Sequence, residues 1–295
     1  MSGHGNWRHL DSERAGLVLV FISAIGFGTL GIFGIYAQRA NLSIPTVLVF
    51  RFVFATIVVW AFLAWRGRLT LLQGRALLIA LGLGAFGYAT QSGLYFVGLE
   101  FMTAGMVAIV LYTYPVFVVI LAVTLIGERV SRPMLVALCF ALGGIALVTG
   151  ANPAGASLVG VLVVLGAALA YAVYITFSRA MLMTIDPMVL TAYVLPAAGT
   201  SFIVIGTASG DLMLPQTLSA WTILLCIGVF ATAIPVVAFF TGLKQIGASR
   251  AGIISTAEPP VTVALGAVLF AEPVTAATVI GGVLILIGVI VLERK

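Results

Sequence analysis

The chain has 295 residues, of which 62% are hydrophobic and only 8% are charged. Soluble domains carry roughly 25% charged residues, so this composition excludes a water-soluble fold. The net charge of +5 at pH 7 does not indicate a nucleic-acid partner, because the cations are spread among short loops. The two cysteines lie in separate apolar stretches without metal-ligand spacing, so we expect no metal site there.

Ten apolar stretches follow one another, each about as long as the 20 residues that cross a bilayer core about 30 Å thick. In the first half we expect spans at residues 15–36, 45–65, 76–97, 103–126 and 132–150. In the second half we expect spans at residues 157–178, 187–206, 219–240, 250–270 and 274–292. The connections are too short for a soluble domain, so the sequence predicts an all-α membrane protein with ten transmembrane helices.

Lysine and arginine residues of the loops and tails fall on one side of the predicted membrane. With ten spans both termini share that side, and Arg39 is the one loop cation on the other side. Cytoplasmic loops carry such an excess, so we expect an inner (plasma) membrane protein with both termini in the cytoplasm and residues 1–14 as a cytoplasmic tail. The first apolar run has full membrane length and lacks a convincing cleavage site, so we expect it to stay as the first span.

Two segments share one pattern at a spacing of 144 residues. YTYPVFVVILAVTLIGE at 112–128 matches TAEPPVTVALGAVLFAE at 256–272, with Pro115 on Pro259 and Glu128 on Glu272. The match continues upstream, so the chain reads as a five-helix unit written twice, at residues 15–150 and 151–295. Because five is odd, the second unit starts on the opposite side of the membrane. Inverted repeats of this kind are typical of secondary transporters whose substrate site lies near the midplane.

The segments YPVFVVILAVTLIGE and EPPVTVALGAVLFAE resemble the paired signatures of the drug/metabolite transporter superfamily, specifically of its ten-helix EamA-type bacterial exporters. The resemblance covers essentially the whole chain, which by overall likeness looks like the branch that exports amino acids, aromatic ones among them. It implies a central cavity lined mainly by the third, fourth, eighth and ninth spans, with contributions from the first and sixth, and with the fifth and tenth spans peripheral. Other small metabolites, nucleosides and cationic drugs are the alternative substrates within the superfamily.

Glu258 is an acid within an apolar span. It lies about eight residues into the ninth span, about 12 Å deep at 1.5 Å per residue. An ionisable group at that depth is costly unless it faces a cavity, a partner or water. Glu258 therefore binds a substrate amine or carries a coupled proton, or else it is protonated or tied to a neighbouring helix. Tyr114 occupies the matching position of the first copy, so this position is polar in both copies and charged in one.

Prolines interrupt both signature spans. Pro115 and Pro259 each lack an amide proton and free the carbonyl four residues earlier, which is that of Ser255 in the second copy. Three interpretations are open: the freed group accepts a ligand, the bend moves during transport, or the kink is static. Pro260 and Pro235, in the ninth and eighth spans, are further candidate helix breaks.

Arg51 lies about six residues into the second span, about 9 Å from its outer end. The leading interpretation is that its long side chain snorkels to the nearby membrane interface. In the alternative, Arg51 faces the cavity and binds the carboxylate of a zwitterion whose amine meets Glu258.

Polar aromatic residues recur at helical spacing in two spans. Tyr88, Gln91 and Tyr95 share one face of the third span, and Tyr171 and Tyr174 repeat the arrangement in the sixth. Such stripes can stack a ring while leaving hydroxyls for polar contacts, and ordinary helix packing is the alternative. The candidate substrate-binding residues are therefore Glu258, Tyr88, Gln91, Tyr112, Tyr171, Tyr174, Ser255, Arg51 and Tyr95.

A transporter is favoured over other classes of membrane protein. An enzyme would need an assembled catalytic group, yet both histidines, His4 and His9, precede the first span. A channel favours polar rings from several chains, whereas the inverted repeat favours alternating access. We therefore expect a secondary amino-acid exporter without a cofactor, in which the two repeats rock around a small-molecule substrate within the lipid bilayer. The coupling ion and the oligomeric state are left open, a monomer being sufficient.

Overall fold

The computed structural model describes residues 4–101, 107, 110–148, 157–270 and 274–293, and the regular elements among them are all helical. The first half contains α1 (His4–Arg39), α2 (Ile44–Trp65), α3 (Gly74–Gly82), α4 (Ala89–Phe101), α6 (Tyr114–Leu121) and α7 (Arg132–Val148). The second half contains α8 (Leu158–Met181), α9 (Pro187–Ser209), α10 (Leu218–Gly228), α11 (Ile234–Ile246), α12 (Ala248–Ile254), α13 (Glu258–Phe270) and α14 (Ala276–Glu293).

These helices form ten apolar segments, which correspond to the ten predicted spans. Within the described residues, seven segments are long enough to cross a membrane alone, and three shorter ones contribute to the fourth, fifth and tenth spans. The prediction of an all-α membrane fold is therefore confirmed. The helix α1 already begins at His4, so most of the expected tail continues the first helix.

Non-α turns join the parts of the broken spans. The π-helical segment η1 (Leu83–Tyr88) joins α3 to α4, and η4 (Val229–Ala233) joins α10 to α11. A third π-helical segment, η2 (Ala122–Ile126), ends the fourth span, and the 3₁₀ turn η5 (Ser255–Ala257) joins α12 to α13. Such π-helical turns inside α-helices are frequent at functional sites, so the backbone alone marks the third and eighth spans as candidates for a functional site.

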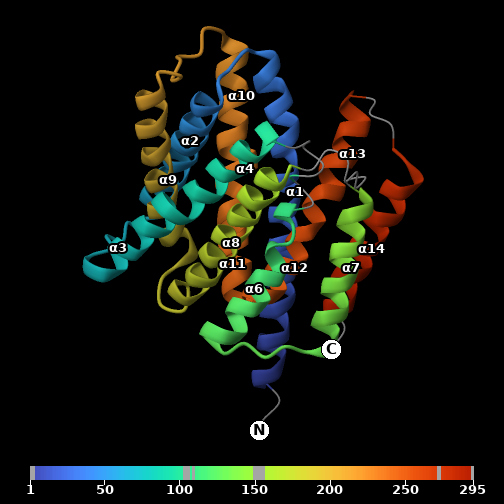
Figure 1. Ribbon diagram of the computed structural model, residues 1–295. Helices are drawn as coiled ribbons and strands as arrows, with labels where there is room; N and C mark the ends of the chain where they lie inside the picture. Colours follow the sequence, from blue (N-terminus) through green and yellow to red (C-terminus); the bar gives the residue numbers. More distant parts are fainter. Residues whose placement is uncertain (1–3, 102–106, 108–109, 149–156, 271–273, 294–295) are drawn as a thin grey trace.

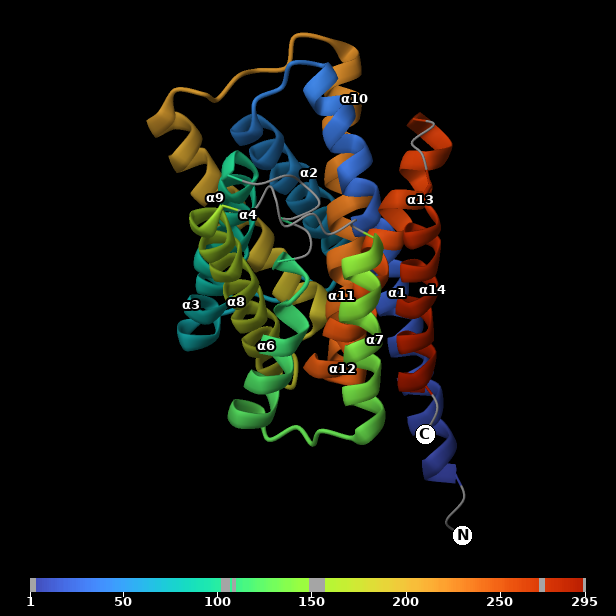
Figure 2. The same ribbon diagram turned by 45° about the vertical axis from the view of Figure 1, so that its right-hand side comes forward.

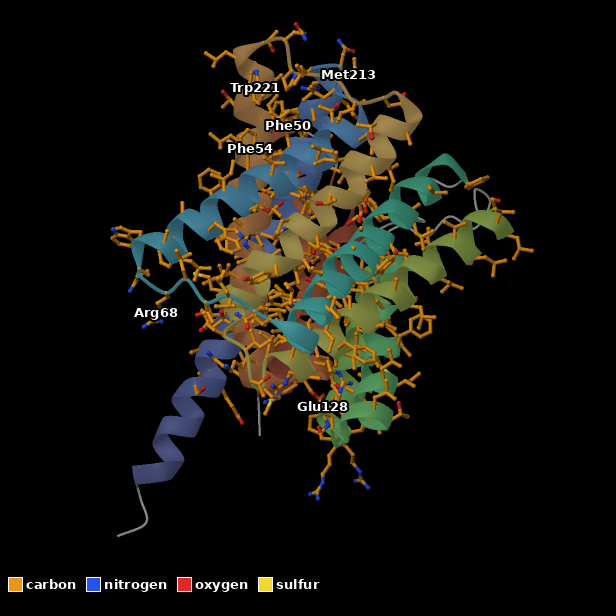
Figure 3. The ribbon with its side chains drawn as sticks, turned by 90° about the vertical axis from the view of Figure 1, so that its left-hand side faces the viewer. Phe50, Phe54, Arg68, Glu128, Met213 and Trp221 are labelled. Carbon is orange, nitrogen blue, oxygen red and sulfur yellow. The ribbon has the colours of Figure 1, made fainter. Side chains whose placement is uncertain are left out.

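Successive spans run in alternate directions through one bundle, and α1 begins at the same end of the bundle at which α14 ends (Figure 1). That end carries Arg68 and Glu128, whereas Phe50, Phe54 and Trp221 lie near the opposite end (Figure 3). We call these the Arg68 end and the Trp221 end. At the latter, the Trp221 ring makes an edge contact with that of Phe50 at 5.0 Å, a pairing suited to a membrane interface.

Pairs of glycines 144 residues apart let equivalent helices of the two repeats approach closely. A Cβ atom on Gly98 of α4 would collide with Val164 of α8, and one on Gly242 of α11 would collide with Val20 of α1. The two valines are themselves 144 residues apart. The contact of α4 with α8 is thus repeated as the contact of α11 with α1, as an inverted five-plus-five repeat requires.

The fifth and tenth spans pack against each other at one edge of the bundle, where α7 and α14 lie side by side (Figure 2). Gly144 of α7 lies against Gly281 and Ile285 of α14, and Gly288 of α14 lies against Ala137 of α7. Close backbone approach at small residues is how helices associate in lipid. The small residues of these peripheral spans therefore serve a contact within the chain.

A glycine within η1 and another just before η4 allow close packing of these π-helical segments. A Cβ atom on Gly84 would collide with the carbonyl oxygen of Val194 in α9, and one on Gly228 would lie 2.5 Å from the Cβ atom of Phe54 and 3.2 Å from the carbonyl oxygen of Arg51 in α2. Gly84 and Gly228 are another pair separated by 144 residues. The third span therefore packs on α9 as the eighth span packs on α2.

We expect Gly84→Ala to destabilise the fold by about 1–3 kcal/mol, because the new methyl group has no room against the α9 backbone. Thermal unfolding of the detergent-solubilised protein measures this change. Gly82→Ala is the matched control on the same span, since a Cβ atom there would meet no atom within 4 Å. Equal unfolding temperatures for the two variants would contradict the packing described here.

Candidate functional site

Arg51 is buried in the bundle, with a relative exposure of 4%. Its Nε donates a hydrogen bond of 2.8 Å to Thr232 Oγ1, and its Nη2 donates one of 2.8 Å to the hydroxyl of Tyr88. The guanidinium carbon also lies 5.2 Å from the centre of the Phe52 ring. The leading interpretation, snorkelling to the interface, is therefore wrong. Two hydroxyl groups inside the bundle accept from the guanidinium, so the side chain turns inward and does not extend to the interface.

Both hydroxyl partners of Arg51 belong to π-helical segments, Tyr88 at the end of η1 and Thr232 in η4. Thr232 Oγ1 in turn donates a hydrogen bond of 2.9 Å to the carbonyl oxygen of Ile227, five residues earlier in the chain. Thr232 was missed among the predicted site residues. The signal for it was in the sequence, because a shift of 144 residues carries Tyr88 onto Thr232.

Five tyrosines of three spans form a continuous tyrosine cluster, consisting of Tyr88, Tyr174, Tyr171, Tyr114 and Tyr112. The ring of Tyr174 stacks on that of Tyr88 at 5.2 Å and on that of Tyr171 at 6.1 Å, with interplanar angles of 14° and 13°. Tyr171 packs against Tyr114 at 4.7 Å, and Tyr114 lies 6.1 Å from Tyr112. The stripes predicted on the third and sixth spans thus meet where Tyr88 stacks on Tyr174, and the sixth-span stripe continues into the fourth span.

Glu258 lies at the other end of the tyrosine cluster, as the first residue of α13. Its carboxylate lies close to the hydroxyl of Tyr112, and the charge of Arg51 acts on it electrostatically. The side chain is only partly buried. Beside it, Thr262 Oγ1 donates 2.9 Å to the carbonyl oxygen of Gly28, which fixes α13 against α1. The alternative that Glu258 is tied to a neighbouring span therefore has a concrete partner in Tyr112.

Both signature spans are interrupted just before their prolines. A turn at residues 112–113 precedes α6, whose second residue is Pro115, and the turn η5 precedes α13, whose second residue is Pro259. The hydroxyl of Tyr114 donates a hydrogen bond of 3.2 Å to the carbonyl oxygen of Gly252. The fourth span thus binds the broken part of the ninth span through Tyr114.

The remaining predicted residues are placed less centrally. Gln91 accepts a hydrogen bond of 3.3 Å from its neighbour Ser92, and Tyr95 lies within electrostatic range of Glu258. Pro235, the second residue of α11, packs against α1 at Gly26. Pro260 lies near α14, since a Cβ atom on Gly282 of α14 would lie 3.9 Å from the Cβ atom of Pro260.

The arrangement presents one cation, one anion and an aromatic surface between two repeats. A guanidinium has five N–H donors, of which the contacts described above use two, so donors are left for a carboxylate. Glu258 can accept from an ammonium group, and the tyrosine faces can stack a ring or attract a cation. Among the described residues, no group of three or more His, Cys, Asp or Glu side chains could hold a metal ion.

The chain is similar to known proteins along almost its whole length. It is 28% identical over 282 residues to an uncharacterized transporter of Archaeoglobus fulgidus, covering 96% of this chain and 97% of that one. It is 30% identical over 284 residues to the uncharacterized transporter YcbK of Bacillus subtilis (strain 168), covering 92% and 90%. A crystal structure at 20% identity shares the fold, with a TM-score of 0.78 over 95% of this chain and 96% of the other.

The EamA-like transporter family matches residues 14–150 and again residues 158–294. Two family units in tandem agree with the glycine pairs, the π-helical segments and the alternating spans that repeat at 144 residues. The protein is thus a multi-pass membrane transporter that belongs to the EamA-like transporter family, within the drug/metabolite transporter superfamily.

Proposed function

We propose that this transporter exports amino acids, aromatic ones among them, across the inner membrane. The observation that carries the proposal is the pair of opposite charges, Arg51 and Glu258, which the tyrosine cluster connects inside the bundle. An amino acid offers a carboxylate to the first, an ammonium group to the second and, when aromatic, a ring to the tyrosines. Neither charge alone would distinguish a zwitterion from a simple acid or amine.

Substrate binding requires the two repeats to move. Tyr88 and Tyr114 are only 5% and 1% exposed, so a substrate can enter between them only if the third, fourth and sixth spans separate. We propose that residues 15–150 and 151–295 rock as two units around the site, which is alternating access. The breaks before Pro115 and Pro259 are suitable hinges, because hydrogen bonds between residues three apart replace regular α-helical ones there and the prolines cannot donate one. Pro235 and Pro260 are secondary candidates.

Glu128 holds the Arg68 end closed. Its carboxylate accepts hydrogen bonds of 2.9 Å from the Ala248 amide, 3.3 Å from the Ser249 amide and 2.8 Å from Ser249 Oγ. This contact joins the end of the fourth span to the start of the ninth, one from each repeat. We propose that it must break when this end opens. The excess of cations supports assigning the Arg68 end to the cytoplasm, with both termini there. The matching Glu272 lies outside the described residues.

A cationic drug or a nucleoside is the second candidate substrate. The stacked faces of Tyr88, Tyr174 and Tyr171 and the acid Glu258 would suit an aromatic cation. The positive charge of Arg51 disfavours that substrate, because it would repel a cation within the same site. A transport assay that offers all three substrate classes in parallel separates these alternatives.

In liposomes preloaded with unlabelled amino acids, we expect the purified protein to exchange labelled amino acids and not a nucleoside or a cationic dye. Amino-acid amides, which lack the carboxylate, should be poor substrates. Arg51→Ala should lower this discrimination about 10- to 100-fold, because a hydrogen bond to a charged group contributes about 1.5–3 kcal/mol. Thr232→Val is the milder variant, since it removes one partner of Arg51 and keeps the charge. Exchange of the dye or the nucleoside alone, or an Arg51→Ala protein that still prefers acids over amides, would contradict the proposal.

Glu258→Gln tests whether this acid carries a coupled proton. If it does, the variant should lose uptake driven by a pH gradient and keep exchange at equal pH, because a glutamine cannot bind and release the proton. Tyr112→Phe is the control, since it removes the hydroxyl partner and keeps the carboxylate. Unchanged pH-driven uptake by Glu258→Gln would remove Glu258 from this role.

Glu128→Gln should open the Arg68 end more often. The readout is the labelling rate of Ser255→Cys by a membrane-impermeant maleimide, in a background with Cys139 and Cys226 replaced by serine. Net loss of one charge-assisted hydrogen bond is worth at least about 1.4 kcal/mol, so the rate should rise about tenfold. Glu13→Gln is the matched control, because Glu13 pairs with Arg250 in a partly exposed contact of 3.7 Å. An equal rise in both variants would argue against a specific closing contact.

A further inference from the structure

A groove of about 730 Å³ opens on the outer wall of the bundle, between α3 with η1 on one side and α8 on the other. Its rim is apolar and strongly exposed, with Phe86 at 77% and Phe177 at 48%. Its floor is lowered by glycines. A Cβ atom on Gly82 would meet nothing within 4 Å, and one on Gly166 would meet only Leu94 Cδ1, at 3.5 Å. The glycines thus leave the groove open, on an apolar outer face of spans three and six.

A single cation stands at the end of this groove. Arg75, in the first turn of α3, lines it and is exposed. Within the described part of the chain, Arg75 makes no ion pair with a carboxylate. From Arg75 to Phe86 the helix rises about 16 Å, which is close to half of a bilayer core about 30 Å thick. Apolar walls one leaflet deep therefore end at a positive charge at the level of the lipid headgroups.

We infer that the groove binds an anionic phospholipid of the leaflet at the Arg68 end. One acyl chain lies between α3 and α8, and the phosphate binds Arg75. Apolar walls select a hydrocarbon chain, and the unpaired guanidinium selects an anionic headgroup over a zwitterionic one. The groove lies outside the proposed substrate position between Arg51 and Glu258, and the two share only the wall residue Tyr174. The inference needs only a membrane-embedded chain, so it stands or falls independently of amino-acid export.

The bound chain would touch the tyrosine cluster from outside. Tyr174 forms part of the groove wall, and its ring stacks at 5.2 Å on that of Tyr88, the partner of Arg51. Gly87 lies between the groove and this ring, since a Cβ atom there would be 3.1 Å from Tyr174 Cδ2. An acyl chain in the groove therefore packs against the helix pair, α3–η1 and α8, that must separate when the site opens.

Photolabelling in vesicles tests the lipid site directly. The full-length protein is reconstituted in phosphatidylcholine vesicles that contain traces of a probe lipid with a diazirine in one acyl chain. The probe is phosphatidylglycerol in one sample and phosphatidylcholine in the other. After illumination, the labelled peptides are mapped by mass spectrometry. We expect the phosphatidylglycerol probe to label residues 74–88 and 166–177 more than the phosphatidylcholine probe does. Arg75→Gln should lower labelling by the phosphatidylglycerol probe about fivefold and leave labelling by the phosphatidylcholine probe unchanged.

Gly82→Leu should abolish labelling of the groove by both probes, because the new side chain occupies the space of the acyl chain. Arg68→Gln and Gly143→Leu are the matched controls, an exposed arginine of the same end and a glycine of α7 with open space around it. If Gly82→Leu does not fold, the surface variant Arg75→Gln still decides between the outcomes.

Three results would overturn the lipid assignment. Equal labelling by the two probes would mean that the groove holds only bulk lipid. Displacement of the probe by a transported substrate would make the groove a substrate path. A dimer in mass photometry that Gly82→Leu dissociates would mean that a second copy of the chain covers the groove.

Discussion

The guanidinium of Arg51 joins three spans, from both repeats, inside the bundle. It binds Tyr88 and Thr232, which occupy the same position in the two repeats, each in a π-helical segment. In a membrane interior a charge must find its partners within the protein, so this contact ties α2 to both the third and the eighth spans. The π-helical turns allow it, because they shift the residues that follow relative to a regular helix and aim both hydroxyls at one point.

The fold could be predicted because its signals are lengths and spacings. Runs of about 20 apolar residues locate the spans. The 144-residue shift that carries Pro115 onto Pro259 also relates Gly98 to Gly242, and the structure shows these glycines in equivalent helix contacts. The breaks before Pro115 and Pro259 likewise follow from local chemistry, since proline cannot donate the hydrogen bond that continues a helix.

The candidate site was harder to predict because the sequence of a helix in lipid does not indicate which of its faces points into the bundle. A soluble helix shows its buried face by apolar periodicity, but these spans are apolar on nearly every face. The direction of Arg51 was therefore undetermined, and depth alone favoured the wrong interpretation, snorkelling. Thr232 was missed for a related reason: a lone threonine in an apolar span is unremarkable until its repeat partner, Tyr88, is known to bind an arginine. Each tyrosine stripe was expected from spacing, but the contact of the two stripes with each other and with the fourth span required the structure.

The two repeats share a backbone and differ in their polar residues, and this difference gives the site a direction. Glu258 of the second repeat is equivalent to Tyr114 of the first. The offset of 142 residues between Pro45 and Pro187 makes Tyr193 the equivalent of Arg51. Tyr193 has another role: its hydroxyl accepts a hydrogen bond of 3.1 Å from the Leu72 amide and so holds the loop after α2. A symmetric pair of repeats would offer a zwitterion two equivalent and opposite orientations. With one cation on α2 and one anion on α13, the proposed site favours a single orientation, while the repeated backbone still provides two related ways to open.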